Sequence, residues 1–87
     1  MSKVKLKVGD LYSLNQLETD SEAEIVDVVC DNKLMLRRLL ELGLTKGSCL
    51  RVKQKSPFGG LVSFAIRDYE LALRSSELKK IIVRLKK

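Results

Sequence analysis

The sequence predicts a mainly β, small α+β protein: a partly open β-barrel of about five short strands. One α-helix is inserted between the first and second strands, and a short helix lies near the N-terminus. Three observations favour this class. The 87 residues are 45% hydrophobic and 32% charged, enough for one small folded domain. Most apolar residues fall in short alternating or β-branched runs, and a single segment has helical periodicity. Closing such strands into a barrel removes most of their edges.

The N-terminal segment, residues 1–11, is predicted to be a basic arm that precedes a folded domain of residues 12–87. Lys3, Lys5 and Lys7 alternate with apolar residues, which is compatible with an edge strand or with a flexible tail. Ser13 and Gln16 then have the spacing of a capping box, which predicts a short helix ending near Glu18.

The central segment contains a strand followed by the one convincing α-helix. Residues 22–30 are rich in Ile and Val and predict a strand. Asp31 and Asn32 offer an N-cap for a helix over residues 33–42, which ends at Gly43. We expect the helix to cover one end of the barrel. Its apolar stripe, which should pack on the core, contains Leu36, Leu39, Leu40 and Gly43, with Met35 and Leu42 beside it.

The remaining chain predicts four more strands and one helical turn. A turn with Gly43 and Gly47 leaves the helix, and a loop with Pro57, Gly59 and Gly60 follows the first of these strands; we interpret these residues as structural turn positions. One helical turn is expected at residues 75–77. The predicted strands cover residues 49–55, 61–67, 69–74 and 81–85.

Composition excludes several classes of function. The chain has no His, so it lacks a Ser-His-Asp or Cys-His nucleophile and a helical His zinc site. Cys30 and Cys49 are too far apart for a CxxC pair and are expected to be free, buried thiols. Asp20, Glu22, Glu24 and Asp27 are better explained as a solvated strand and turn than as metal ligands. No catalytic residue, metal site or cofactor is therefore predicted, and without a membrane-spanning run we expect a cytoplasmic protein.

Surface charge indicates a binding role. Seventeen Lys and Arg against eleven Asp and Glu give a net charge of +6, and six of the acids lie between Glu18 and Asp31. The rest of the surface is therefore strongly basic and suits an acidic patch on a protein partner, although a solvated, self-paired face explains such residues too. Phe58, at a loop tip, either folds back or meets a partner. The candidate partner-binding residues are Arg37, Arg38, Lys46, Arg51, Lys53 and Phe58.

Four ordered motifs resemble those of the FeoA family, across roughly residues 12–85. The run Leu39-Leu40-Glu41-Leu42-Gly43-Leu44-Thr45-Lys46-Gly47 resembles the family's helix-to-turn signature. Pro57-Phe58-Gly59-Gly60 resembles its Pro-Leu-Gly-Asp loop. The C-terminal motif consists of Tyr69-Glu70-Leu71-Ala72-Leu73-Arg74, Ser76-Glu77 and Ile81-Ile82-Val83, and the segment Leu14–Leu17 matches the family's opening.

The resemblance implies an SH3-like barrel and a non-enzymatic accessory protein of bacterial ferrous iron uptake. Its partner would be the cytosolic GTP-binding part of the membrane transporter FeoB, so any membrane association would be indirect. Two alternatives stay open: a basic small-barrel module that binds nucleic acid, and a stand-alone regulatory domain like that of iron-dependent repressors. Nucleic acid is disfavoured because Phe64 and Tyr69 are expected in the core rather than in a stacking platform. Exposed strand edges leave a homodimer open.

Overall fold

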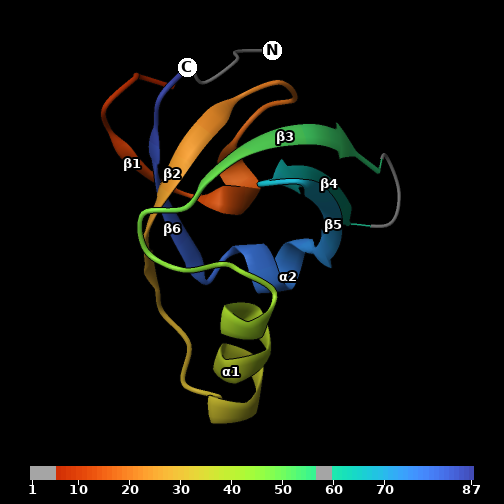
Figure 1. Ribbon diagram of the computed structural model, residues 1–87. Helices are drawn as coiled ribbons and strands as arrows, with labels where there is room; N and C mark the ends of the chain where they lie inside the picture. The colour runs from red at the N-terminus through yellow and green to blue at the C-terminus, as the bar shows by residue number, and fades with distance from the viewer. Residues whose placement is uncertain (1–5, 57–59) are drawn as a thin grey trace.

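The computed structural model describes residues 6–56 and 60–87, and these form one antiparallel six-stranded sheet in the order β1-β6-β2-β3-β4-β5. The sheet curls into a partly open barrel, with the short helix α2 at its lower end and α1 below α2 (Figure 1). The predicted fold class is confirmed. The strands are β1 (Leu11–Ser13), β2 (Glu22–Val28), β3 (Cys49–Lys55), β4 (Leu61–Ile66), β5 (Tyr69–Arg74) and β6 (Ile81–Leu85), and the helices are the 3₁₀ turn η1 (Leu14–Gln16), α1 (Lys33–Glu41) and α2 (Ser75–Leu78).

The sheet has one strand more than the five expected, and the additional strand is β1. It pairs antiparallel with β6, Leu11 opposite Arg84 and Ser13 opposite Ile82. Immediately before it, the Gly9 amide donates to the Leu85 carbonyl at 2.8 Å. Leu11 thus belongs to the sheet. Residues 6–10 form no strand, and residues 1–5 lie outside the described residues, so β1 begins after the alternating segment for which an edge strand or a flexible tail was expected.

One row of inward side chains from each long strand builds the core. Because side chains alternate along a strand, each strand buries one face and leaves the other for solvent. Phe64, at 0% exposure, is a fully buried aromatic member of this core. Leu14 of η1, Leu17 directly after it and Leu78 of α2 are also buried there. The inward residues of β3, β4 and β6 are Leu50 and Val52, then Val62, Phe64 and Ile66, then Ile81, Val83 and Leu85.

Two register shifts accompany the curvature of the sheet. One lies between Ile25 and Asp27 where β2 pairs with β6, and the other between Val52 and Gln54 where β3 pairs with β4. Each leaves one extra residue on the bulged strand, which bends that strand and increases its twist. Such bends allow six short strands to wrap around a single layer of aliphatic side chains.

The helix starts follow the predicted capping chemistry. The Ser13 amide donates to Gln16 Oε1 at 2.9 Å, and the Ser13 hydroxyl donates to the same oxygen at 3.0 Å. The helix that follows is only the three-residue 3₁₀ turn η1, shorter than the helix to Glu18 that we expected. At α1, Asn32 Oδ1 accepts from the amides of Leu34 and Met35, as an N-cap side chain should.

The interpretation of the α1 stripe as core is correct for Leu39 and wrong for Leu40. Leu39 is the buried residue of α1, whereas Leu40 is 45% exposed and Leu34 81% exposed. Met35 packs against the core from the side. The helix touches the barrel through its C-terminal end and extends below it, rather than lying across the barrel as a lid (Figure 1).

Tyr69 at the start of β5 holds the C-terminal end of α1. Its hydroxyl donates to the Leu42 carbonyl, directly before Gly43. Gly43 has a φ of +95°, and a Cβ there would lie 2.5 Å from the Tyr69 hydroxyl oxygen. Gly47 has a φ of +88° but open space around it. Tyr69 is itself 41% exposed, so its predicted place in the core is wrong, because the hydroxyl reaches out to the helix end.

We expect Leu39→Ala to lower the free energy of unfolding by about 2–5 kcal/mol, because it empties a fully buried site that joins α1 to the barrel. Chemical denaturation followed by circular dichroism measures the change. Leu34→Ala is the matched control: its side chain is 81% exposed, so stability should change by no more than about 0.5 kcal/mol. Equal losses in the two variants would contradict the packing described for α1.

We expect Gly43→Ala to destabilise the protein more than Gly47→Ala. Both variants force a side chain into the left-handed region, at a cost on the order of 1–3 kcal/mol, but only the first also meets the Tyr69 hydroxyl. Adding Tyr69→Phe removes the oxygen in the way and should recover part of the loss in the Gly43→Ala background. Thermal unfolding of the three variants tests this order; no recovery on adding Tyr69→Phe would refute the contact.

Candidate functional site

The basic residues predicted to bind a partner fall into two regions of the molecule. Arg37 and Arg38 lie on α1, and Lys46 lies on the segment that leads from α1 to β3. Arg51 and Lys53 lie on β3, along the upper side of the barrel and well separated from α1 (Figure 1). Phe58, with Pro57 and Gly59, lies outside the described residues. The structure therefore does not gather the predicted residues into one patch.

Arg38 fastens α1 to α2. Its guanidinium lies 3.1 Å from Oε2 of Glu77, a residue that is 9% exposed. The other carboxylate oxygen, Oε1, accepts the Arg74 amide at 3.1 Å, so Glu77 joins the end of β5 to α1. A carboxylate this buried needs its cation, because an unpaired buried charge is costly. Arg38 therefore has a structural role, although its side chain is still 61% exposed.

Arg37 is far less constrained. Its guanidinium lies 3.9 Å from the Glu41 carboxylate one turn along, and the two side chains are 79% and 71% exposed. Exposed ion pairs of this kind contribute about 0–1 kcal/mol, so the pair exchanges readily for another partner. Of the two arginines of α1, Arg37 is the one available for recognition.

Exposed leucines stand beside these cations and were missed by the sequence analysis. Leu34 is 81% exposed and Leu40 45%, and Val29 just before the helix is 57% exposed. The signal for Leu34 was present in the sequence: at helical spacing it falls with Arg38 and Glu41, on the polar side of α1. A helix that extends from the barrel and presents leucines next to a loosely held arginine is suited to binding another protein.

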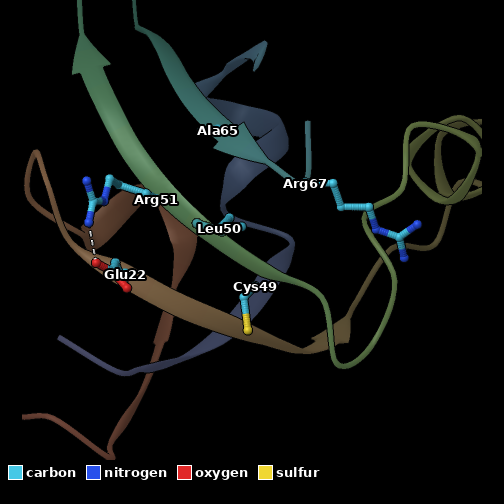
Figure 2. Close-up of a pocket in the computed structure, with 6 residues that line it drawn as sticks. All are labelled: Glu22, Cys49, Leu50, Arg51, Ala65 and Arg67. Atoms are coloured by element: carbon cyan, nitrogen blue, oxygen red, sulfur yellow. Dashed lines mark hydrogen bonds and ion pairs between the residues drawn. The ribbon is translucent and has the colours of Figure 1, made fainter. Parts of the chain in front are cut away.

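The β3 region is dominated by one ion pair. Arg51 Nη2 lies 2.5 Å from Glu22 Oε2 across the β2–β3 pairing, as Figure 2 shows. This hydrogen bond from Arg51, together with its charge, holds the pKa of the Glu22 carboxyl below its ordinary value despite opposing desolvation. The same bond raises the pKa of Arg51. Arg51 is thus already partnered. Lys53, the extra residue of the β3 bulge, and Lys55, whose Nζ donates to the Asn15 carbonyl, make no ion pair in the described part of the chain.

A shallow hollow of about 230 Å³ lies over this pair, between β2, β3 and the end of β4. Figure 2 shows that the Arg67 side chain extends away from Arg51 rather than over the hollow. The Cys49 thiol lines it and is exposed, so the expectation of two buried thiols is wrong for Cys49; both cysteines are free. A hollow this open has room for a side chain of a partner but does not enclose a small molecule.

Three of the six acidic residues between Glu18 and Asp31 bind groups of the protein itself. Besides Glu22, the Glu24 carboxylate pairs with Lys86 at 3.1 Å, and Asp27 Oδ1 accepts the Val28 amide at 2.8 Å. Across residues 6–56 and 60–87, no three His, Cys, Asp or Glu side chains gather to hold a metal ion. Over the same ranges, no helix has the length and hydrophobicity to cross a bilayer. The described surface offers cations and leucines for binding.

Comparison with known proteins places the chain in a family. The sequence profile of the FeoA domain matches residues 12–85. In Porphyromonas gingivalis, a Fe(2+) transport protein A/Fe(2+) transporter FeoB fusion protein is 35% identical over 72 residues, which are 83% of this chain and only 8% of the fusion protein. The chain thus spans a small fraction of that relative's length.

Solved structures agree with the profile. FeoA from Stenotrophomonas maltophilia, crystallised with zinc and described as a procaryotic SH3 domain protein, is 33% identical, with a TM-score of 0.72 over 83% of this chain and 88% of that one. A manganese-dependent transcriptional repressor has a TM-score of 0.82 over 93% of this chain and 45% of its own, at 22% identity. The repressor similarity shows a shared fold. With a profile match over residues 12–85 and this SH3-like barrel, the chain belongs to the FeoA family.

Proposed function

We propose that the chain is a non-enzymatic accessory protein of ferrous iron uptake that binds the cytosolic GTP-binding part of an FeoB-like transporter. The observation that carries this proposal is the Porphyromonas gingivalis relative, in which a segment similar to this chain is part of one polypeptide with FeoB. Fusion keeps two domains at a high effective concentration, and selection for fusion favours domains that work together. Docking would influence GTP turnover or transporter assembly.

A specific contact between two domains needs surface affinity, whether or not a linker joins them. This requires exposed side chains that gain free energy on burial, and α1 supplies them. Leu34, at 81% exposure, has nearly its whole side chain available, and burying a leucine contributes about 1.5–3 kcal/mol. Arg37 adds a cation that an acidic residue of the partner can bind in place of Glu41. We therefore assign α1 as the docking element.

The β3 region is a weaker candidate because its arginine already has a counter-ion. Glu22 neutralises Arg51, and the hollow beside them is shallow. Nucleic acid binding is disfavoured on similar grounds: Phe64 is fully buried, and Tyr69 is committed to the Leu42 carbonyl. These two aromatics form no stacking platform within residues 6–56 and 60–87, so the basic surface would bind oligonucleotides weakly and with strong salt dependence.

The function is tested by measuring binding of the purified chain to the cytosolic part of an FeoB-like transporter, with a single-stranded oligonucleotide in parallel. We expect binding to the transporter fragment and only weak, salt-sensitive binding to the oligonucleotide. No binding to the fragment at low salt, together with tight oligonucleotide binding, would refute the proposal.

The docking element is tested by two substitutions on α1. Leu34→Ala should weaken binding to the transporter fragment by about tenfold, because an exposed leucine no longer becomes buried. Arg37→Glu should weaken it by about fivefold and reduce its dependence on salt. Isothermal titration calorimetry gives both values, and thermal unfolding should be unchanged since neither residue supports the fold.

Lys53→Glu provides the matched control, because it makes the same change of charge on β3. It should bind like the unmodified chain. If Lys53→Glu weakened binding and the two α1 variants did not, the docking element would be β3 and the assignment of α1 would be wrong. Arg38 is unsuitable for this test, because reversing its charge would leave two carboxylates facing each other at Glu77.

A further inference from the structure

The β5 edge of the sheet ends without a neighbouring strand. In the strand order, β5 follows β4 and closes the sheet. Six residue pairs join it to β4, from Ile66–Tyr69 to Leu61–Arg74. The sheet has two edge strands, β1 and β5. β5 has six residues and β1 only three, so β5 offers the longer unpaired edge. An unpaired edge is a template for another strand unless something blocks it.

The hydrogen-bonding groups of β5 that face away from β4 can be identified. The Ser75 amide donates to the Gly60 carbonyl at 2.5 Å, one pair beyond Leu61–Arg74. Because hydrogen-bonded and non-hydrogen-bonded pairs alternate in an antiparallel ladder, Leu73 and Leu71 also bond toward β4. The backbone groups of Glu70, Ala72 and Arg74 therefore point outward. The Arg74 amide agrees with this, because it donates to Glu77 rather than to β4.

The side chains of these three residues lie on the outer, solvent face of the sheet. Glu70, Ala72 and Arg74 are all exposed, whereas the residues between them, Leu71 and Leu73, turn toward the core. In the described part of the chain, neither Glu70 nor Arg74 makes an ion pair. The edge thus presents an acid, a small residue and a base at equal spacing.

We infer that β5 is a self-association edge, on which a second copy of this chain pairs antiparallel with Ala72 at the two-fold axis. In this register the two Ala72 residues exchange amide-to-carbonyl bonds. Glu70 of each copy lies opposite Arg74 of the other, so that their side chains can form an ion pair. The Arg74 backbone adds no bond to this register, because its amide donates to Glu77 and its carbonyl is the N-cap carbonyl of α2, which accepts the first helical amide. A two-fold interface must be self-complementary, and the order acid–small–base has that property when it is read in reverse on the partner.

Charge selects this register over its neighbours. Shifting the two-fold axis to Glu70 would place two carboxylates directly opposite each other, and shifting it to Arg74 would place two guanidinium groups together. The selected register also continues the cross-strand row of the outer face. That row runs from Glu22 to Arg51, Ala65 and Glu70, so a guanidinium from the second copy comes next to Glu70.

Sedimentation velocity over a concentration series up to millimolar protein tests the inference. We expect a concentration-dependent monomer–dimer equilibrium in the unmodified chain. Glu70→Arg and Arg74→Glu should each weaken it by about tenfold, because the like-charge pair occurs twice in the dimer. The double variant, Glu70→Arg with Arg74→Glu, restores opposite charges and should dimerise within about threefold of the unmodified chain.

Controls separate pairing at the edge from general effects of charge. Glu18→Arg and Lys53→Glu make the same changes of charge at other exposed positions and should leave the equilibrium unchanged. Ala72→Pro removes the central amide donor without breaking a bond to β4 and should abolish the dimer. A chain that stays monomeric throughout, or a dimer that ignores the charge variants, would overturn the inference. Transporter binding by a monomeric variant would leave the proposed function standing.

Discussion

The structure depends on enclosing one thin layer of aliphatic side chains with strands that each have a single face to bury. Every long strand contributes alternate residues to this layer, around Phe64. A flat sheet would leave half of the layer in water, so the strands must curl, and the bulges in β2 and β3 are the points where they bend. Leu14 of η1, Leu17 after it and Leu78 of α2 join the same buried cluster. Most buried side chains of this core come from the strands and from segments other than α1, which contributes Leu39.

This small share of the core explains why α1 is available for other work. The helix contributes one fully buried side chain, Leu39, and is then held by polar contacts: Arg38 with Glu77, and Tyr69 with the Leu42 carbonyl. These contacts fix where the helix lies without covering its leucines. Because α1 is already held in place while its leucines are exposed, binding a partner would not require a further loss of entropy to order the helix.

The sequence predicted the strands well because the period of two is visible in every inward row, and β3 was predicted with its observed bounds. It missed β1, since three residues such as Leu11, Tyr12 and Ser13 are too few to show any period. The sequence also predicted more residues of α1 to be buried than the structure buries. Amphipathicity indicates which side of a helix faces the protein, but not how much of that side is covered. The Arg38–Glu77 pair joins residues 39 positions apart, and no local pattern predicts it. The sequence suggested candidate basic residues, which stay predictions, and their division between α1 and β3 became visible only with the topology.

The helix α1 and the β5 edge are linked at two places: Glu77 joins Arg38 to the Arg74 amide, and Tyr69 binds the end of α1. Tyr69 is the first residue of β5, and its hydroxyl binds the carbonyl at the end of α1. A second copy that orders β5 would restrict Tyr69, and Tyr69 would then restrict α1. We expect binding at one place to lower the entropy still to be lost at the other, so that dimer formation and partner docking would favour each other. A partner on α1 would then strengthen the β5 pairing by the same factor, and removing the Tyr69 hydroxyl should weaken this coupling while leaving each surface in place.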